Sequence, residues 1–562
     1  MVKTRGQSRG ASAADLDRRD LLASFLGASG AVLLEGCQSR ERDIGLPPGE
    51  LVGPSVALGH RIRDGLRLSF PERELQATQV VIVGGGIAGL AAARRLHQEG
   101  IEDFVLLELE PEAGGTSRSG QSDIVAYPWG AHYVPAPTRE FPALVQLFDE
   151  VGVFEGTDAV GDPVVAEEFR CRHPEERLYY KGIWYEGLYL ASGASVDDHR
   201  QMTRFRAEMD RWVAWRDGRG RRAFAVPVAA GSDDPVVRAL DAITMAQWLD
   251  QRGFDSPRLR WWVDYACRDD YGLRLEQTSA WAGIYYYCAR IPEVGAAARP
   301  FVTWPEGNGR LVHHLYSGVR SQCLLGAAVT EVTPRQVEGK AVVDVLGVKA
   351  ESQQLFGYRA ERVIFAAPQF LSRYLIRDYR DNTPRHVTEF SYGAWAVANL
   401  TLSEIPQSEG FPLAWDNVLY ESPSLGYVAT SYQRGLDYGP ALITYYYPLC
   451  DDDPRAARQR LLQLDREEWA EIALADLGRA HTGIRESAQR VDVMRWGHAM
   501  IQPRPGFVWG KARQLASQPF RGVHFGHSDL SGIALFEEAF FHGTRAAEEV
   551  LAALRGRVDS IL

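Results

Sequence analysis

The sequence predicts an α/β fold with two domains, one of which contains a parallel sheet. Between residues 79 and 96 an apolar strand runs into a glycine-rich turn and then into a helix, which is how a βαβ unit begins. Further β-rich runs occur at residues 392–402 and 441–449, which indicates a second sheet. The chain has 562 residues, of which 45% are hydrophobic, which is enough for two cores.

The composition excludes two kinds of site. Charged residues make up 24% of the chain and the net charge is -11, so no basic face is expected to bind nucleic acid. The six cysteines are far apart and form no CxxC pair, and the 13 histidines are scattered. Because metal sites need clustered ligands, we expect no metal and no disulfide framework.

The first 37 residues are predicted to be a targeting signal rather than part of the fold. Arg18 and Arg19 directly precede a weakly apolar run, residues 21–34, which is too short to span a bilayer as a mature helix. The pattern resembles a twin-arginine signal peptide. A basic amphipathic helix that belongs to the fold is the alternative.

The signal is followed by a second pattern, Leu34-Glu35-Gly36-Cys37. It is similar to a lipobox, although Glu35 fits poorly, so Cys37 is a candidate lipid anchor and its lipidation stays open. We expect an exported protein, either periplasmic or membrane-anchored on the outer side of the inner membrane or on the outer membrane. Residues 38–75 have no sustained period and are predicted to be a tether outside the fold.

The glycine turn has the spacing of a dinucleotide-binding motif. Residues 79–83 form the strand, Gly84-Gly85-Gly86-Ile87-Ala88-Gly89 the turn, and residues 90–96 the helix. Gly84 permits the tight turn, Gly86 lets the backbone approach a pyrophosphate, and Gly89 lets helix and strand pack closely. The helix N-terminus attracts the anion. This predicts a Rossmann-like domain.

The residues that follow the next strand favour one dinucleotide over another. Phe104–Leu107 ends at Glu108, about 20 residues beyond the turn, where a carboxylate accepts hydrogen bonds from the ribose. A second glycine pair, Gly114 and Gly115, follows shortly afterwards. Because the extended diphosphate and ribityl chain of FAD needs another close backbone approach, FAD is favoured over NAD.

With these motifs the chain resembles the flavin amine oxidase superfamily, which includes monoamine and polyamine oxidases, protoporphyrinogen oxidase and carotenoid desaturases. Three later segments carry the same resemblance, namely residues 304–311, 329–332 and 363–368. It implies a discontinuous Rossmann-like FAD-binding domain joined to an α+β substrate domain. In such a fold the backbone at Val329 meets the adenine.

The C-terminal segment, residues 523–547, follows the closing motif of that superfamily. The resemblance implies a helix N-terminus under the isoalloxazine, with the backbone at Phe536 in contact, and it makes Asp529 the candidate for the ribityl contact. No cysteine occurs in this segment. The cysteinyl link of monoamine oxidases is therefore not expected, and FAD is predicted to be noncovalent.

Motif and resemblance together define the expected FAD site. Its predicted contacts are Gly84, Gly86, Ala88, Gly89, Glu108, Gly114, Gly115, Thr116, Arg118, Val329, Asp529 and Phe536. In the superfamily the glycine doublet is usually followed directly by arginine, whereas here Thr116 and Ser117 precede Arg118. The expected FAD-binding domain comprises residues 76–170, 300–369 and 491–562, and the substrate domain residues 171–299 and 370–490.

The substrate domain is expected to pair helices with a sheet over the flavin. Helical periodicity occurs in residues 202–215, 239–251 and 258–267, and β-rich runs occur at Tyr392–Leu402 and Ala441–Leu449. Asp269 and Asp270 end a helical pattern just before Gly272. A solvated helix end with local ion pairs is the favoured interpretation, and a place near a cavity is the alternative.

The catalytic candidates are Tyr446, Trp496 and His132. The stretch from Arg495 to Pro503 resembles protoporphyrinogen oxidases and desaturases more than amine oxidases. No lysine occurs between Lys349 and Lys511, whereas many amine oxidases place a lysine beside flavin N5. Both observations weaken the assignment of an amine substrate.

The expected function is that of an FAD-dependent oxidoreductase. It would oxidise a C–H, C–N or C–C bond of a small organic molecule by hydride transfer to flavin N5, with dioxygen or a quinone as electron acceptor. A desaturase-like or protoporphyrinogen oxidase-like enzyme on an apolar substrate and a non-catalytic flavin-binding electron-relay protein are the alternatives.

Overall fold

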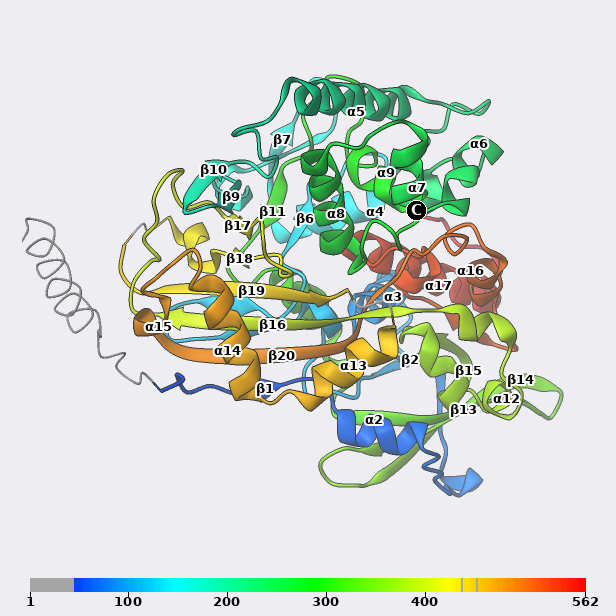
Figure 1. Ribbon diagram of the computed structural model, residues 1–562. Helices are drawn as coiled ribbons and strands as arrows, with labels where there is room; N and C mark the ends of the chain where they lie inside the picture. The colour runs from blue at the N-terminus through cyan, green and yellow to red at the C-terminus, as the bar shows by residue number, and fades with distance from the viewer. Residues whose placement is uncertain (1–44, 436–437, 451–452) are drawn as a thin grey trace, which may run out of the picture. The chain divides into compact units, whose positions relative to one another are not determined.

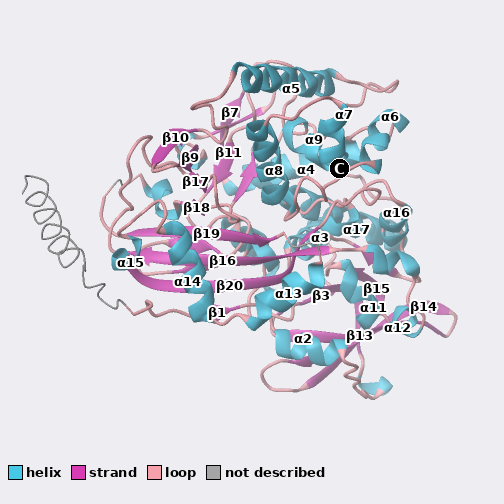
Figure 2. Cartoon of the chain, viewed as in Figure 1, coloured by secondary structure: helices cyan, strands magenta, loops and turns pink. Residues whose placement is uncertain are grey.

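Two large sheets organise the part of the chain that the computed structural model describes, residues 45–435, 438–450 and 453–562 (Figures 1 and 2). The predicted signal and Cys37 lie outside the described residues. The first sheet has the strand order β12-β3-β2-β15-β14-β13, and β21 pairs with β15. Its strands are β2 (Gln76–Val83), β3 (Phe104–Leu107), β12 (Cys323–Leu324), β13 (Ala327–Val337), β14 (Lys340–Lys349), β15 (Leu355–Phe365) and β21 (Val523–Phe525).

The first sheet is the Rossmann-like one that the glycine motif predicts. Strands β12, β3, β2, β15 and β21 run parallel to one another in it, although they come from three separate stretches of chain, and β14 pairs with β15 antiparallel. Three helices pack on one face through a shared hydrophobic cluster, namely α3 (Ile87–Gln98), α10 (Gly309–Val319) and α17 (Phe536–Arg555). The prediction of a discontinuous α/β domain is confirmed.

Two glycines set how closely these elements approach. A Cβ on Gly89 would lie 1.9 Å from the carbonyl oxygen of Gly84, and a Cβ on Gly543 would lie 2.1 Å from that of Ala88. No other residue type fits at such distances. Strand β2, helix α3 and helix α17 are therefore held in backbone contact.

The second sheet has the order β1-β20-β16-β19-β18-β17-β9-β10. Its strands are β1 (Leu51–Val52), β9 (Glu176–Tyr180), β10 (Ile183–Glu186), β16 (Tyr392–Leu402), β17 (Asp416–Leu419), β18 (Tyr427–Val428), β19 (Ala441–Leu449) and β20 (Ala488–Ile501). Figure 1 shows α13 (Pro454–Gln463) and α14 (Arg466–Leu477) across the face of β16 and β20. Both β-rich runs of the sequence are strands with the predicted bounds.

The helices of the substrate domain form their own hydrophobic cluster. They are α5 (Val196–Ala214), α6 (Pro235–Arg238), α7 (Met245–Gln251), α8 (Pro257–Tyr271) and α9 (Ala280–Cys288). The periods found at residues 202–215 and 258–267 are confirmed as α5 and α8. The period at 239–251 is confirmed only in its second half, because residues 239–242 form a separate short 3-10 turn.

Shorter elements complete the described chain. The helices are α2 (Val56–Arg63), α4 (Pro142–Val151), α11 (Ser372–Leu375), α12 (Arg377–Asp381), α15 (Ile484–Ser487) and α16 (Lys511–Ala516). The strands are β4 (Ser119–Gln121), β5 (Ala126–Pro128), β6 (Tyr133–Pro135), β7 (Phe154–Thr157), β8 (Pro163–Val165) and β11 (Phe301–Thr303). No helix of the described chain combines the length and the apolar character needed to cross a membrane.

Two predicted boundaries are wrong. Residues 491–501 lie within β20, in the middle of the second sheet, so they do not belong to the FAD-binding domain. Within the expected tether, β1 pairs with β20, and the α2 side chains of Leu58 and Ile62 are buried in a core cluster. These two elements are too short to show a period, and distant parts of the chain hold them in place.

Candidate functional site

A cavity of about 1240 Å³ opens between the two sheets. Its wall begins at the carboxyl ends of β2 and β3 and includes the start of α17, strand β20 and the end of α8. Ligand sites in open α/β sheets lie at the carboxyl ends of the strands. The volume exceeds that of most pockets for a single small molecule, so there is room for a dinucleotide and a substrate together.

The glycines of the first motif have the geometry that a bound dinucleotide requires. Gly84 has φ +105°, in the range that favours glycine. Gly86 lines the cavity, and a Cβ added there would meet nothing within 4 Å. Gly114 and Gly115, with φ of +119° and +57°, line the same wall. The backbone at Gly86 is thus open for close approach by a ligand.

Glu108 lies on the cavity wall beside this glycine turn. Its carboxylate accepts hydrogen bonds from the Gly85 N–H at 2.5 Å and the Glu110 N–H at 2.9 Å. Burial raises the pKa of Glu108, and these two hydrogen bonds lower it in part. The carboxylate is therefore held in a fixed orientation, as a ribose acceptor must be.

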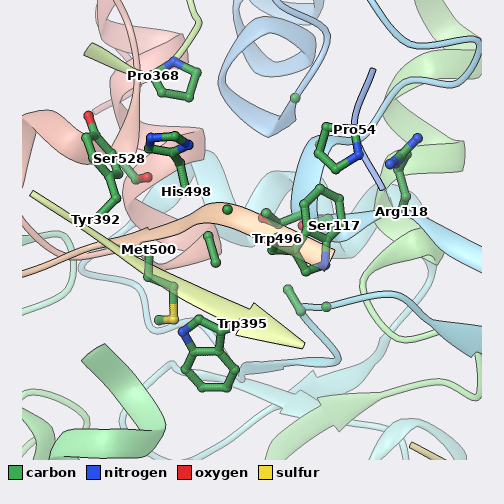
Figure 3. Close-up of a pocket in the computed structure, with 18 of the residues that line it drawn as sticks. Pro54, Ser117, Arg118, Pro368, Tyr392, Trp395, Trp496, His498, Met500 and Ser528 are labelled. Carbon is green, nitrogen blue, oxygen red and sulfur yellow. The ribbon is translucent and has the colours of Figure 1, made fainter. Parts of the chain in front are cut away.

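Arg118 reaches the cavity although two residues separate it from the glycine doublet. Its guanidinium carbon lies 5.4 Å from the ring centroid of Trp496. Its Nε is buried and has no hydrogen-bond partner within the described residues. A buried donor without a partner is costly, so this atom suits a polar group of a bound cofactor. Figure 3 shows Arg118 and Ser117 together at one end of the pocket.

Asp529 lines the cavity, but its carboxylate already has three partners. It accepts hydrogen bonds from the Tyr392 hydroxyl at 2.5 Å and the Gln369 N–H at 2.8 Å, and it pairs with His527 at 3.0 Å. Burial raises the pKa of Asp529, but His527 and Tyr392 outweigh it and the net shift is downward. If Asp529 also contacts the ribityl chain of FAD, as predicted, its carboxylate must accept that hydrogen bond in addition to those from its present partners.

The remaining predicted cofactor contacts are also brought together. Val329 lines the cavity with Ala327 and Ala328, and Ala88 and Thr116 lie on the same wall. Gly89 is not on the wall but underneath it, against Gly84. Helix α17 begins at Phe536 on the wall and has no side-chain cap, so its partial positive charge faces the cavity. The cavity therefore fits FAD.

Acidic side chains line the substrate-domain end of the cavity. Asp269 and Asp270 from α8, Asp416 from β17 and Glu537 from α17 all lie on its wall, together with Arg290. The favoured interpretation of Asp269 and Asp270 as a solvated helix end is wrong. The ion pair expected there joins Arg268 to Asp264 at 3.2 Å, on a different side of the helix.

Burial perturbs these carboxyl groups strongly. It raises the pKa of Asp269 well above its ordinary value, and Asp270 adds to this shift while Arg290 opposes it. Burial also raises the pKa of Asp416, to about 7, and that of Glu537. Arg290 stays protonated, because Tyr133, Asp270 and Glu537 together outweigh the effect of its burial.

The three catalytic candidates meet around one loop. The His132 ring lies 4.9 Å from Tyr446 and 5.2 Å from Trp415 between centroids. Tyr446 donates a hydrogen bond to the carbonyl of Gly130 at 2.9 Å, and Trp496 donates one to that of Trp129 at 2.6 Å. Burial lowers the pKa of His132 to about 4. These side chains form an aromatic wall with satisfied polar groups.

Asp416, Glu537 and Arg290 were not predicted as site residues. They lie far apart in sequence; Asp416 and Arg290 match no motif, and Glu537 falls in the closing motif, which was assigned to the flavin. Within the described chain no lysine lines the cavity, and no cluster of His, Cys, Asp or Glu has the make-up of a metal site.

The chain matches the family model of flavin containing amine oxidoreductases over residues 87–551, and it belongs to that family. Putrescine oxidase bound to putrescine has a similar structure, with a TM-score of 0.62 and 18% identity over 85% of this chain and 100% of that one. Cyclohexylamine oxidase from Brevibacterium oxydans has a TM-score of 0.58 and 15% identity over 85% of this chain and 99% of that one.

Among curated proteins, bovine (Bos taurus) amine oxidase [flavin-containing] B is 28% identical over 178 residues. The match covers 31% of this chain and 28% of that protein, so the chain matches less than a third of this relative's length. Family membership implies FAD as the resident cofactor. The glycine turns, Glu108, Arg118 and the start of α17 would hold it.

Gly86→Val should weaken flavin binding without unfolding the protein. Gly86 has φ -71°, which valine adopts readily, and the added side chain projects into open cavity. Overpacking of about 1–3 kcal/mol would weaken binding by roughly 5- to 150-fold. The measurement is the flavin-to-protein ratio of the purified variant. Gly218→Val, at an exposed glycine with nothing within 4 Å of its Cβ, is the matched control, and full flavin content in Gly86→Val would refute the assignment.

Proposed function

We propose that the protein is an FAD-dependent oxidoreductase that oxidises a small amine bound as a cation. One observation carries this proposal: three aspartates and Glu537 face the inner cavity, and Arg290 is the basic side chain among them. Buried carboxyl groups without matched cations are costly unless they hold protons or bind a cation. An ammonium group supplies that cation.

Aromatic rings complete the binding surface. Tyr133, Tyr265 and Trp395 line the same cavity, and their faces attract both alkyl groups and cations. The Tyr265 hydroxyl donates a hydrogen bond to Asp416 at 3.1 Å, which orients that carboxyl group. A wholly apolar substrate would leave the carboxyl groups unpaired, so the desaturase alternative is disfavoured.

Bound FAD supplies the acceptor for the hydride equivalent, whose electrons pass on to dioxygen or a quinone. The bound ammonium first gives a proton to an ionised carboxylate of the cavity, and the resulting amine then loses a hydride, that is two electrons and a proton, so that a protonated imine forms. The side chains of this chain bind the ammonium, orient the carbon beside nitrogen and exclude water. Putrescine, the ligand in the structure of putrescine oxidase, is a diamine, and a second ammonium would use more of these carboxylates.

Substitution of the α8 carboxylates tests the proposal. Asp269→Asn and Asp270→Asn should each raise KM for a diamine about 10- to 150-fold, because the bound ammonium favours the ionised carboxylate and each change removes a charged contact worth ~1.5–3 kcal/mol. Glu276→Gln, an exposed acid just beyond α8, is the control. Reduction of the wild-type flavin is a separate test.

Amines should bleach the flavin of the wild-type protein under anaerobic conditions. If no amine bleaches it while dithionite does, the result supports a non-catalytic electron-relay protein instead.

The same carboxyl groups give amine binding a pH dependence. With a pKa of about 7, Asp416 holds a proton below that pH and carries a charge above it. KM for the amine should therefore fall between about pH 6 and pH 8, and the affinity should be lost as pH falls through 7. Asp416→Asn should flatten this part of the profile.

We also propose that the FAD is noncovalent. None of the five cysteines in the described chain, Cys171, Cys267, Cys288, Cys323 and Cys450, lines the cavity. The flavin should pass through an ultrafilter after denaturation of the protein. Flavin retained with the polypeptide would contradict this.

We propose, finally, that the protein is exported through a twin-arginine route, which carries folded cargo and so suits an enzyme that must take up FAD beforehand. The support is the sequence around Arg18 and Arg19 alone. Changing both to lysine should trap the precursor in the cytoplasm, as seen by fractionation. Cys37→Ala should release the protein from membranes if that cysteine is a lipid anchor.

A further inference from the structure

A segment before the first glycine motif forms part of the cavity wall. Residues 47–63, here called the strap, contain β1 and α2. The family match begins at residue 87, so the strap lies outside the matched region, as do β2 and the first glycines of the turn. Its residues Leu51–Val56, Gly59, His60, Ile62 and Arg63 line the cavity. Figure 3 shows Pro54 of the strap close to Ser117 and Arg118, at the cofactor end of the pocket.

The strap is tied to the turn that carries the ribose acceptor. Ser55 donates its backbone N–H to one carboxylate oxygen of Glu110 at 2.8 Å and its hydroxyl to the other at 3.1 Å. The Glu110 N–H in turn donates to Glu108 at 2.9 Å. A short chain of hydrogen bonds therefore connects the strap to Glu108, and we call the Ser55–Glu110 contact the clasp.

Two further contacts hold the ends of the strap. At its start, Pro48 and Glu50 accept hydrogen bonds from the N–H groups of Val491 and Val493 at 2.9 and 2.8 Å. A Cβ on Gly49 would lie 1.8 Å from the carbonyl oxygen of Val491, so only glycine permits this approach. At its end, Leu58 and Ile62 are buried in the core cluster that also contains Val83 and Leu107, the last residues of β2 and β3.

We propose that the strap is a latch for the cofactor, which closes over the nucleotide end of FAD and must open before FAD can enter or leave. Its attachments are a two-residue strand, the clasp, two buried side chains and the polar contacts of Pro47 and Glu50 with Arg466, Arg490 and Asp492. An isolated helix as short as α2 is not stable in water. The free energy needed to open the strap is therefore smaller than that needed to open the sheets. Because bound FAD contacts only the closed strap, it shifts the equilibrium toward the closed state.

Flavin release in the absence of substrate tests the latch. Gly49→Ala displaces the strap at a position outside the cavity wall, and Glu110→Ala removes the acceptor of the clasp. Each should speed the release of FAD on dilution, followed by flavin fluorescence, by roughly tenfold or more. Gly218→Ala and Glu112→Ala, at exposed positions, are the matched controls and should release FAD at the wild-type rate. If both strap variants released FAD at the wild-type rate, the proposal would be overturned.

Hydrogen exchange of the unsubstituted full chain provides a second test that does not depend on how the variants fold. The amides of residues 49–63 should exchange more slowly with FAD bound than after its removal. Equal exchange in the two states would overturn the latch. The inference rests on FAD binding and not on the identity of the substrate, so a protein that is bleached by amines but shows neither effect would lose only the latch.

Discussion

The structure depends on the backbone contact between β2, α3 and α17. Gly89 and Gly543 allow this contact, because a Cβ at either position would lie about 2 Å from a backbone oxygen. Both helices begin on the cavity wall, at Ile87 and Phe536. Their partial positive ends therefore face one space, where a dinucleotide can bind. Because α17 comes from the far end of the chain, this contact also closes the FAD-binding domain.

The cavity is electrostatically divided. Its nucleotide end combines two helix starts without side-chain caps with the Nε of Arg118, which has no partner among the described residues, whereas its substrate end has four carboxyl groups and Arg290 on its wall. Burial raises the pKa values of these carboxyl groups. Some of them are therefore protonated when no cation is bound. The two ends thus favour ligands of opposite charge.

The second sheet connects the two ends of the cavity to the strap. Strand β20 pairs with β16 on one side and with β1 of the strap on the other. Its residues Trp496 to Ile501 line the cavity. One strand therefore supports both the wall over the cofactor and the segment that would cover the nucleotide, which couples the strap to the body of the protein through main-chain hydrogen bonds.

The sequence by itself determined what depends on local pattern. The glycine turn, the acid after β3 and the bounds of β16 and β19 were predictable, since each follows from spacing or residue type within a short window. Only the tertiary structure decided the acidic site, because Asp416, Glu537 and Arg290 come from segments far apart in sequence. It also placed Asp269 and Asp270 in the cavity rather than in solvent. Burial depends on which segments meet, and for the same reason the strap, which the sequence predicts to be part of a tether, is held in the fold by β20 and Glu110.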